Sequence, residues 1–254
     1  MTEERRSADG MLGKGLRLLV ALGDHPDGAG VSRLARDVEV PVSTAHRLLA
    51  GMVPLGFVSF DRERRRYSLG LCTFELGQRV ASARRLSDVA LPAMRRVTQA
   101  TGETTLLAVL SGDDVLYVER TEGKHLAQIW GAPGARGSPH YTSLGKCLVA
   151  FLPEEEWEET LSRLRLERLT PRTITDAEGL REELLLTRER GYATNDEEHE
   201  EGVRAVGVPV IGRHGRPAAA LSVATLKFRH SMEELEGFVP LLRDAAREVE
   251  VQLR

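Results

Sequence analysis

Four side chains in one short segment have the hydrogen-bonding groups needed to read DNA. Ser43, Thr44, His46 and Arg47 carry hydroxyl, imidazole and guanidinium groups within a single run of the chain. At the leading end of a helix such side chains reach base edges and phosphates in the major groove, and an arginine can pair with guanine. We predict that these residues, together with Arg33 on the preceding segment, contact double-stranded DNA.

A second basic segment follows closely and has the composition of a phosphate contact. It contains Arg62, Arg64, Arg65 and Arg66. Arginines at the tip of a hairpin neutralise backbone phosphates, which adds affinity and orientation but little sequence information. An isolated run of four arginines is a solvated surface turn about as often as it is a DNA contact. Its place just after the first basic segment favours DNA contact.

The elements that must position these side chains form a helix-turn-helix pattern. Apolar residues recur at helical spacing in residues 31–38, with Ser32 as a candidate N-terminal cap. Pro41 has the fixed backbone angle of a first helical turn, so a second helix is expected from there to about Val53. The residues with DNA-reading groups then occupy the first half of the second helix.

A hairpin and an earlier helix complete the pattern of a winged helix. Residues 56–60 and 66–69 are strand-like, and the charged turn between them makes them a two-stranded wing. Residues 12–22 are expected to form a helix that packs beneath the other two. We predict that its inner stripe consists of Leu12, Leu16, Leu19 and Val20.

Length and composition exclude several classes of protein. The 254 residues suffice for two ordinary domains. The sequence shows no apolar run of about eighteen residues and no charged-then-apolar leader, so we expect neither a membrane partner nor export, and a cytoplasmic location. Cys72 and Cys147 are far apart and without metal-ligand spacing, so both are expected to be buried.

Charge is distributed unevenly along the chain. The formal net charge is −3, but residues 1–90 hold 14 Lys or Arg against 11 Asp or Glu, whereas residues 91–254 hold 21 against 27. DNA binding depends on the local field and not on the sum. A mildly basic front and an acidic rear fit a DNA-reading domain joined to one that does not touch DNA.

Periodicity predicts a two-domain α+β protein. From Thr104 the apolar period changes from that of helices to that of strands. Strands are expected over residues 104–110, 115–120, 127–130, 208–211 and 219–225, and helices over 145–152, 154–164, 177–191 and 232–253. The expected divisions are a disordered arm at 1–10, a winged helix at 11–70, a linker helix at 71–90 and an α/β domain at 91–254.

Three groups of residues outside the winged helix have the types found at reactive sites. Residues 195–199 place carboxylates beside an imidazole, but no second histidine or cysteine stands at ligand spacing, so we expect neither a metal nor a cofactor. Ser143 and Ser222 lie outside any Gly-x-Ser-x-Gly motif and are better read as hydroxyls that bind a ligand. His140, just before an expected helix start, is either part of an anion site or a satisfied core histidine.

Four ordered segments carry a family resemblance. They are Val42–Leu49, Tyr141–Lys146, the run from Gly191 through Asp196–His199 and Gly202–Arg204 to Val208–Val210, and Ala220–Val223. Over residues 12–253 the chain resembles IclR-type transcriptional regulators. The resemblance implies a GAF-like effector-binding domain behind the winged helix, a homodimer or dimer of dimers, and ligand-controlled binding to a promoter operator.

The resemblance also implies a set of pocket residues for a small-molecule effector. Carried over position by position, they are Leu126, Ile129, Gly137, Ser143, Leu144, Asn195, Val203, Ala205, Ser222 and Ala224. The chain departs from the family pattern at three of them. Ala205 stands where Cys is frequent, Ala224 where a second hydroxyl is frequent, and Asn195 where an acid is common. An organic acid remains a candidate effector, and a larger or less polar ligand becomes plausible beside it.

Three functions compete at this point, and the favoured one is a transcriptional regulator switched by a small metabolite. An enzyme with an accessory nucleic-acid-binding domain is the alternative. It lacks support because the sequence contains no phosphate loop, nucleophile elbow, metal quartet or dinucleotide fingerprint. A third interpretation keeps the fold without a ligand, as an architectural DNA-binding protein. We therefore expect a non-enzymatic regulator.

Overall fold

The computed structural model describes residues 10–84, 86–124 and 130–253. The chain divides into two compact units, Met1–Ala83 and Arg84–Arg254, and each is described by itself. Within the described residues, no helix has both the length and the hydropathy required to span a membrane.

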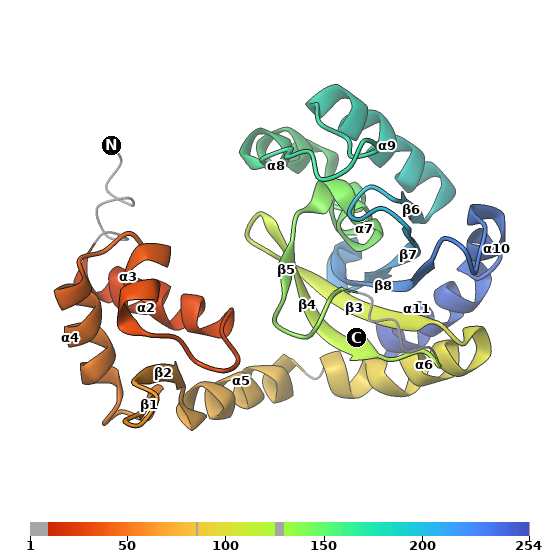
Figure 1. Cartoon of the computed structure of the whole chain (residues 1–254). Helices are drawn as coiled ribbons and strands as arrows, with labels where there is room; N and C mark the ends of the chain where they lie inside the picture. The colour runs from red at the N-terminus through yellow and green to blue at the C-terminus, as the bar shows by residue number, and fades with distance from the viewer. Residues whose placement is uncertain (1–9, 85, 125–129, 254) are drawn as a thin grey trace. The chain divides into compact units, whose positions relative to one another are not determined.

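The described part of the first unit begins with helices α2 to α4 and a hairpin, and ends with helix α5 (Figure 1). The helices are α2 (Met11–Gly23), α3 (Val31–Asp37) and α4 (Val42–Met52), and the antiparallel strands are β1 (Val58–Asp61) and β2 (Arg66–Leu69). Leu18, Leu34, Leu49 and Tyr67 are among the residues of their common core. The next helix, α5, spans Leu71–Arg84.

Two expectations for this unit are wrong. Helix α2 buries Gly15, Leu18 and Leu22, whereas Leu12, Leu16 and Val20 are exposed and Leu19 is half-buried. Apolar residues surround most of this helix, so their spacing does not determine which face turns inward. Helix α3 begins after Gly30 without a side-chain cap, so Ser32 lies inside the helix and does not cap it.

The second unit is built on a six-stranded sheet in the order β5-β4-β3-β8-β7-β6, with antiparallel neighbours throughout. The strands are β3 (Thr104–Ser111), β4 (Asp114–Thr121), β5 (Arg136–Gly137), β6 (Ala193–Asp196), β7 (Val203–Ile211) and β8 (Pro217–Leu226).

Helices cover both faces of this sheet (Figure 1). One face packs on α6 (Leu86–Thr101), α10 (Met232–Glu236) and α11 (Val239–Leu253), around Met94, Leu221 and Leu242. The other face packs on α7 (Ser143–Ala150), where Leu144 and Leu148 are buried. Short turns η1 (Pro139–Tyr141) and η2 (Glu154–Glu156) and helices α8 (Trp157–Arg163) and α9 (Ala177–Arg190) complete that side.

Several expected elements differ from the structure in their bounds. The helix expected over 232–253 is two helices that are separated near Gly237. Strand β6 is not predicted from the sequence, because its four residues alternate in burial but only Ala193 is apolar. Of the strand expected over 127–130, residues 127–129 lie outside the described residues, and Trp130 is not in a strand.

The two cysteines differ in burial. Cys147 is fully buried, as expected, and burial raises the pKa of its thiol to about 12. Cys72 is only partly buried, contrary to the expectation, because it follows the wing at the start of α5, where little of the core lies.

Candidate functional site

Helix α4 presents the expected DNA-reading side chains on its accessible face. Ala45 and Leu49 are fully buried and hold the helix against the core. On the other side of the helix, Ser43, His46 and Arg47 are exposed and Thr44 is half-buried. Arg33 on α3 is also exposed. The guanidinium of Arg47 lies 3.7 Å from Met11 Sδ at the start of α2.

The wing presents its arginines on a well-defined turn. Asp61 Oδ1 accepts hydrogen bonds from the backbone N–H groups of Glu63 and Arg64, at 2.9 and 3.0 Å, which closes the turn. Arg65 takes the left-handed conformation with φ of 53°. The exposed arginines of this turn are Arg62, Arg64, Arg65 and Arg66.

Tyr67 ties the wing to the rest of this unit. Its buried ring packs on Phe60 at a centroid distance of 4.6 Å and lies edge-on to His46 of α4 at 6.4 Å. Its backbone pairs with Ala29 in the loop before α3. These contacts join the basic turn to the loop before α3 and to α4 within one compact unit.

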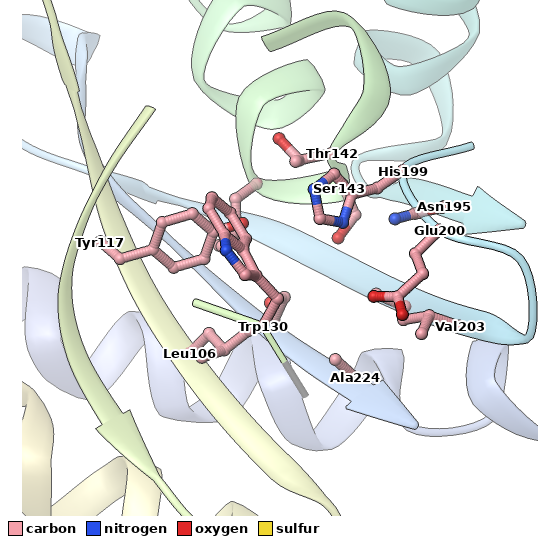
Figure 2. Close-up of a pocket in the computed structure, with 13 residues that line it drawn as sticks. Leu106, Tyr117, Trp130, Thr142, Ser143, Asn195, His199, Glu200, Val203 and Ala224 are labelled. Carbon is pink, nitrogen blue, oxygen red and sulfur yellow. The ribbon is translucent and has the colours of Figure 1, made fainter. Parts of the chain in front are cut away.

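The second unit contains a cavity between the sheet, α7 and the loop that joins β6 to β7 (Figure 2). Its volume is about 30 Å³ in this structure, so a ligand larger than a few atoms requires the lining side chains to move. Its lining residues are Leu106, Tyr117, Trp130, Thr142, Ser143, Leu144, Asn195, His199, Glu200, Val203, Ala205, Ser222 and Ala224.

Small residues in register on the sheet leave room for this cavity. Ser222 of β8 is paired with Leu106 of β3 on one side and with Gly207 of β7 on the other. In the neighbouring row, Ala224 pairs with Ala205, which in turn pairs with Asn195. A Cβ atom at Gly207 would lie 3.2 Å from Ser143 Oγ, so the sheet approaches the start of α7 closely there.

One end of the cavity is rich in hydrogen-bond donors. Thr142 Oγ1 caps α7 by accepting from Gly145 N–H at 3.0 Å, whereas the N–H groups of Ser143 and Leu144 belong to the first turn and have no acceptor within the helix. The hydroxyls of Ser143 and Ser222, in side chains only 2% and 1% exposed, make no hydrogen bond to other described residues.

Asn195 adds a further donor, and its orientation is fixed. Its Oδ1 atom accepts from the backbone N–H of Glu198 at 2.9 Å. Because a backbone N–H can only donate, the amide oxygen must face Glu198, and the amide NH₂ group is then left for the cavity. The residue is 5% exposed and lines the cavity.

The rings of Tyr117 and Trp130 form the opposite wall (Figure 2). Trp130 lies edge-on to Tyr117 at 5.1 Å and is tilted against His199 at 4.8 Å. Burial lowers the pKa of His199 and raises that of Tyr117, so at neutral pH both rings are uncharged. The described lining has one acidic side chain, Glu200, and no lysine or arginine.

Most of the expected pocket residues meet at this cavity. Seven of them line it: Ser143, Leu144, Asn195, Val203, Ala205, Ser222 and Ala224. Gly137 lies behind the aromatic wall, since its Cβ position is 3.4 Å from the Trp130 ring. Leu126 and Ile129 lie outside the described residues.

Six lining residues are not among the individual pocket residues expected from the sequence, although three of them, Thr142, His199 and Glu200, lie in the expected segments 141–146 and 195–205; the other three are Leu106, Tyr117 and Trp130. Leu106 lies beside Ser222 because of the register in which β3 pairs with β8, and no local sequence pattern shows that register. His199, a possible metal ligand by its place among carboxylates, has aromatic rings as its partners. The one available signal is the concentration of aromatic residues near the expected strands, since Tyr117 and Trp130 are two of a small number in the chain.

Two further candidate sites, the acidic segment 195–199 and His140, have structural partners in the described part of the chain. Asp196, Glu197 and Glu198 each pair with a cation, namely Arg204, Lys227 and Lys146 respectively. No cluster of three or more His, Cys, Asp or Glu side chains suited to a metal occurs among the described residues. His140 is fully buried, with Nδ1 at 2.6 Å from Ser138 Oγ and Nε2 at 3.1 Å from the Glu167 carbonyl, so it is a satisfied core histidine.

Comparison with known proteins identifies the class of protein that this fold and cavity define. Residues 11–62 match the model of the IclR helix-turn-helix domain, and residues 78–251 match that of the bacterial transcriptional regulator IclR C-terminal domain. The transcriptional regulator KdgR of Escherichia coli is 35% identical over 236 residues, which cover 93% of this chain and 89% of that protein. The E. coli repressor IclR is 30% identical over 94% of this chain and 88% of its own length.

Solved structures agree with the sequence relatives. IclR of Thermotoga maritima aligns with a TM-score of 0.75 and 30% identity, over 95% of this chain and 98% of that one. An IclR homologue from Microbacterium hydrocarbonoxydans in complex with 4-hydroxybenzoate aligns with a TM-score of 0.83 and 33% identity, over 96% and 99%. The chain therefore belongs to the IclR family of transcriptional regulators, with an N-terminal helix-turn-helix domain and a C-terminal ligand-binding domain.

Proposed function

We propose that this regulator binds operator DNA through α4 and the wing and is switched by a small organic acid held in the cavity. The observation that carries the proposal is the donor-rich end of that cavity. Ser143 and Leu144 at the start of α7, Asn195 of β6 and Ser222 of β8 all line the cavity and carry hydrogen-bond donors. Donors that converge on one region suit an anionic acceptor such as a carboxylate.

The opposite wall indicates the remainder of the ligand. Tyr117, Trp130 and Leu106 offer flat and apolar surface, which suits a ring or a short hydrocarbon. The homologue crystallised with 4-hydroxybenzoate is a relative that binds a molecule of this kind. We propose an aromatic carboxylate as the effector class.

The same residues argue against the enzyme alternative. Neither Ser143 nor Ser222 makes a hydrogen bond to a base among the described residues, which a serine nucleophile requires. The relatives found by comparison are transcriptional regulators.

We further propose that the DNA-bound species is a homodimer or a dimer of dimers. One winged helix covers a short half-site, and symmetric operators are read by symmetric proteins. A ligand controls such a complex only if it binds one conformational state more tightly than the other. A purely architectural DNA-binding protein would lack this differential binding.

The experiment measures ligand binding and DNA binding on one preparation. Benzoate, 4-hydroxybenzoate and the matched neutral compound benzamide are titrated against the full-length protein, followed by thermal shift and by quenching of tryptophan fluorescence. A Trp157→Phe background leaves Trp130 as the sole reporter, since the chain has two tryptophans. DNA binding is then measured on a duplex that the protein itself selects from a random pool, with and without the acid.

We expect the carboxylates to raise the melting temperature and change the DNA affinity, with benzamide much weaker. Arg47→Ala should weaken binding to the selected duplex more than to a scrambled one. If no carboxylate in the series binds, the ligand class is wrong. If the acid binds but DNA affinity does not change, the ligand is not a regulator.

A further inference from the structure

A buried ion pair stands beside the cavity without lining it. Lys146 of α7 is 1% exposed, and its Nζ atom donates to both carboxylate oxygens of Glu198 at 2.7 and 2.8 Å. Glu198, 8% exposed, lies in the loop between β6 and β7. Glu183 of α9 is 3.5 Å from the same Nζ and is itself bound by Arg190 at 2.7 Å.

Stability alone is a weak reason for such a pair. Removing two charges from water costs about as much as their attraction returns, and a well-packed apolar pair of similar volume is often as stable. Burial raises the pKa of the Glu198 carboxyl, whereas the neighbouring Lys146 ammonium lowers that pKa. Loss of Lys146 therefore favours the protonated form of Glu198. What the pair does provide is one defined geometry between α7 and the loop.

That geometry reaches directly into the cavity. The backbone N–H of Glu198 is the group that fixes the Asn195 amide, at 2.9 Å. Its carbonyl accepts from Thr173 Oγ1 at 2.6 Å, and the preceding residue, Glu197, has a φ of 65°. The next residue, His199, also lines the cavity and packs on the Trp130 ring, so Glu198 is linked to both a donor and a ring of the ligand space.

We propose that Lys146 and Glu198 are positioning residues for the effector: their ion pair holds the loop so that the Asn195 amide presents its NH₂ group and His199 its ring to the ligand. The proposal rests on the proposed function for the identity of the site as a ligand pocket. Neither side chain touches the ligand. Both act through Asn195 and His199.

A readout without ligand is available because Asn195 is the only asparagine in the chain. Labelling with ¹⁵N-asparagine therefore labels one side-chain NH₂ group. Its two proton resonances report the orientation and order of this amide in the full-length protein. In the wild type we expect two sharp, well-separated proton resonances. Glu198→Gln and Lys146→Met should broaden or shift them.

The double variant Lys146→Met/Glu198→Met separates positioning from folding. It contains no buried unpaired charge, so its melting temperature should approach that of the wild type, whereas the Asn195 signal should remain perturbed. The matched control is the exposed pair Arg216–Glu156, whose double variant Arg216→Met/Glu156→Met should leave the signal unchanged.

Ligand affinity provides the second measurement. With 4-hydroxybenzoate as the probe, we expect each single variant and the double variant to bind about tenfold to a hundredfold more weakly than the wild type, the range for one lost hydrogen bond to a charged group. The control pair should bind as the wild type does.

The outcomes distinguish the two proposals. A double variant with wild-type Asn195 resonances, or with wild-type affinity, overturns the positioning role. A wild type that binds no carboxylate probe, together with an Asn195 signal that depends on the pair, overturns the proposed effector class and leaves the positioning role standing.

Discussion

Asn195 is the cavity residue whose chemistry is most fully determined by its surroundings. Its oxygen is committed to the Glu198 N–H, so it acts toward the ligand as a donor only. An aspartate at this position would offer no donor at neutral pH. It would also place a negative charge beside the N–H groups of Ser143 and Leu144, where the ligand's carboxylate is proposed to lie.

Asn195→Asp should therefore weaken carboxylate binding by about tenfold or more, the equivalent of roughly 1.5–3 kcal/mol for a hydrogen bond to a charged group. Isothermal titration with benzoate measures the loss. Benzamide is the control ligand, because its neutral head group should be affected far less. An equal loss for both compounds would contradict a carboxylate at this end of the cavity.

His140 gives the second unit a dependence on pH. Burial lowers its pKa, and its two ring nitrogens are occupied in the neutral form. The unfolded chain takes up a proton near pH 6.5 that the folded chain resists, so the free energy of unfolding falls as pH decreases through that value. The lowered pKa of His199 acts in the same direction.

We expect the melting temperature to fall between about pH 7.5 and pH 5.5, with a smaller fall in His140→Gln, which no longer titrates there. Differential scanning calorimetry at several pH values tests this. His214, which is exposed, is the control position: His214→Gln should leave the slope unchanged. An identical slope in His140→Gln would exclude His140 as its source.

The residues that the sequence could and could not place differ in a physical way. Ser143, Asn195 and Ser222 lie in segments with recognisable patterns, so the resemblance is enough to nominate them, and they meet at one cavity. Trp130 and Leu106 enter the cavity through ring packing and strand register, which depend on contacts between distant segments. Those contacts leave no local pattern to read.

At the scale of elements, periodicity is reliable where one face alone is apolar. Helix α4, expected over about 41–53, spans Val42–Met52, and the wing strands fall where turn residues bound them. Periodicity fails to predict the buried face of α2, where Leu12, Leu16 and Val20 are exposed although they have helical spacing. It also fails for β6, which is too short to show a period.

The wing carries a prediction about electrostatics. Arg64→Ala/Arg65→Ala should weaken binding to all duplexes alike and reduce the slope of log affinity against log salt by about one to two units, the effect of losing one or two phosphate contacts. Fluorescence anisotropy over a salt series measures both quantities. Arg247→Ala, an exposed arginine of α11, is the control. An unchanged slope would show that the wing turn remains in solvent.

At the scale of the whole molecule, the proposed dimer requires a surface on which two copies of the chain meet. We propose that Phe74, Leu76 and Val80 of α5 form the contact between subunits. Phe74 and Leu76 are 64% and 45% exposed, and the side chain of Val80 lies outside the described set. Singly exposed apolar residues are ordinary, whereas a contiguous apolar surface favours association. Leu71, which is 79% exposed, lies one helical turn before Phe74 and shares its face of α5.

Phe74→Asp/Leu76→Asp should lower the molar mass measured by light scattering at micromolar concentration, because it places charges in the proposed subunit contact. Leu186→Asp on α9, at a residue that is 52% exposed, is the matched control and should keep the wild-type mass. A wild type that is monomeric and binds a single half-site would contradict the proposed dimer.

Regulation requires that the cavity in one unit influence DNA binding by the other, and Ser222 tests this coupling. Ser222→Leu fills space beneath α7 and removes a hydroxyl, in a unit that does not contain α4 or the wing. Ligand binding and its effect on DNA affinity should both be lost, while DNA affinity without ligand should stay near the wild-type value.

Anisotropy titrations with and without 4-hydroxybenzoate measure all three quantities, and Ser162→Leu at an exposed serine of α8 controls for added bulk. A Ser222→Leu protein that responds to the acid with an unchanged midpoint would place the effector site elsewhere.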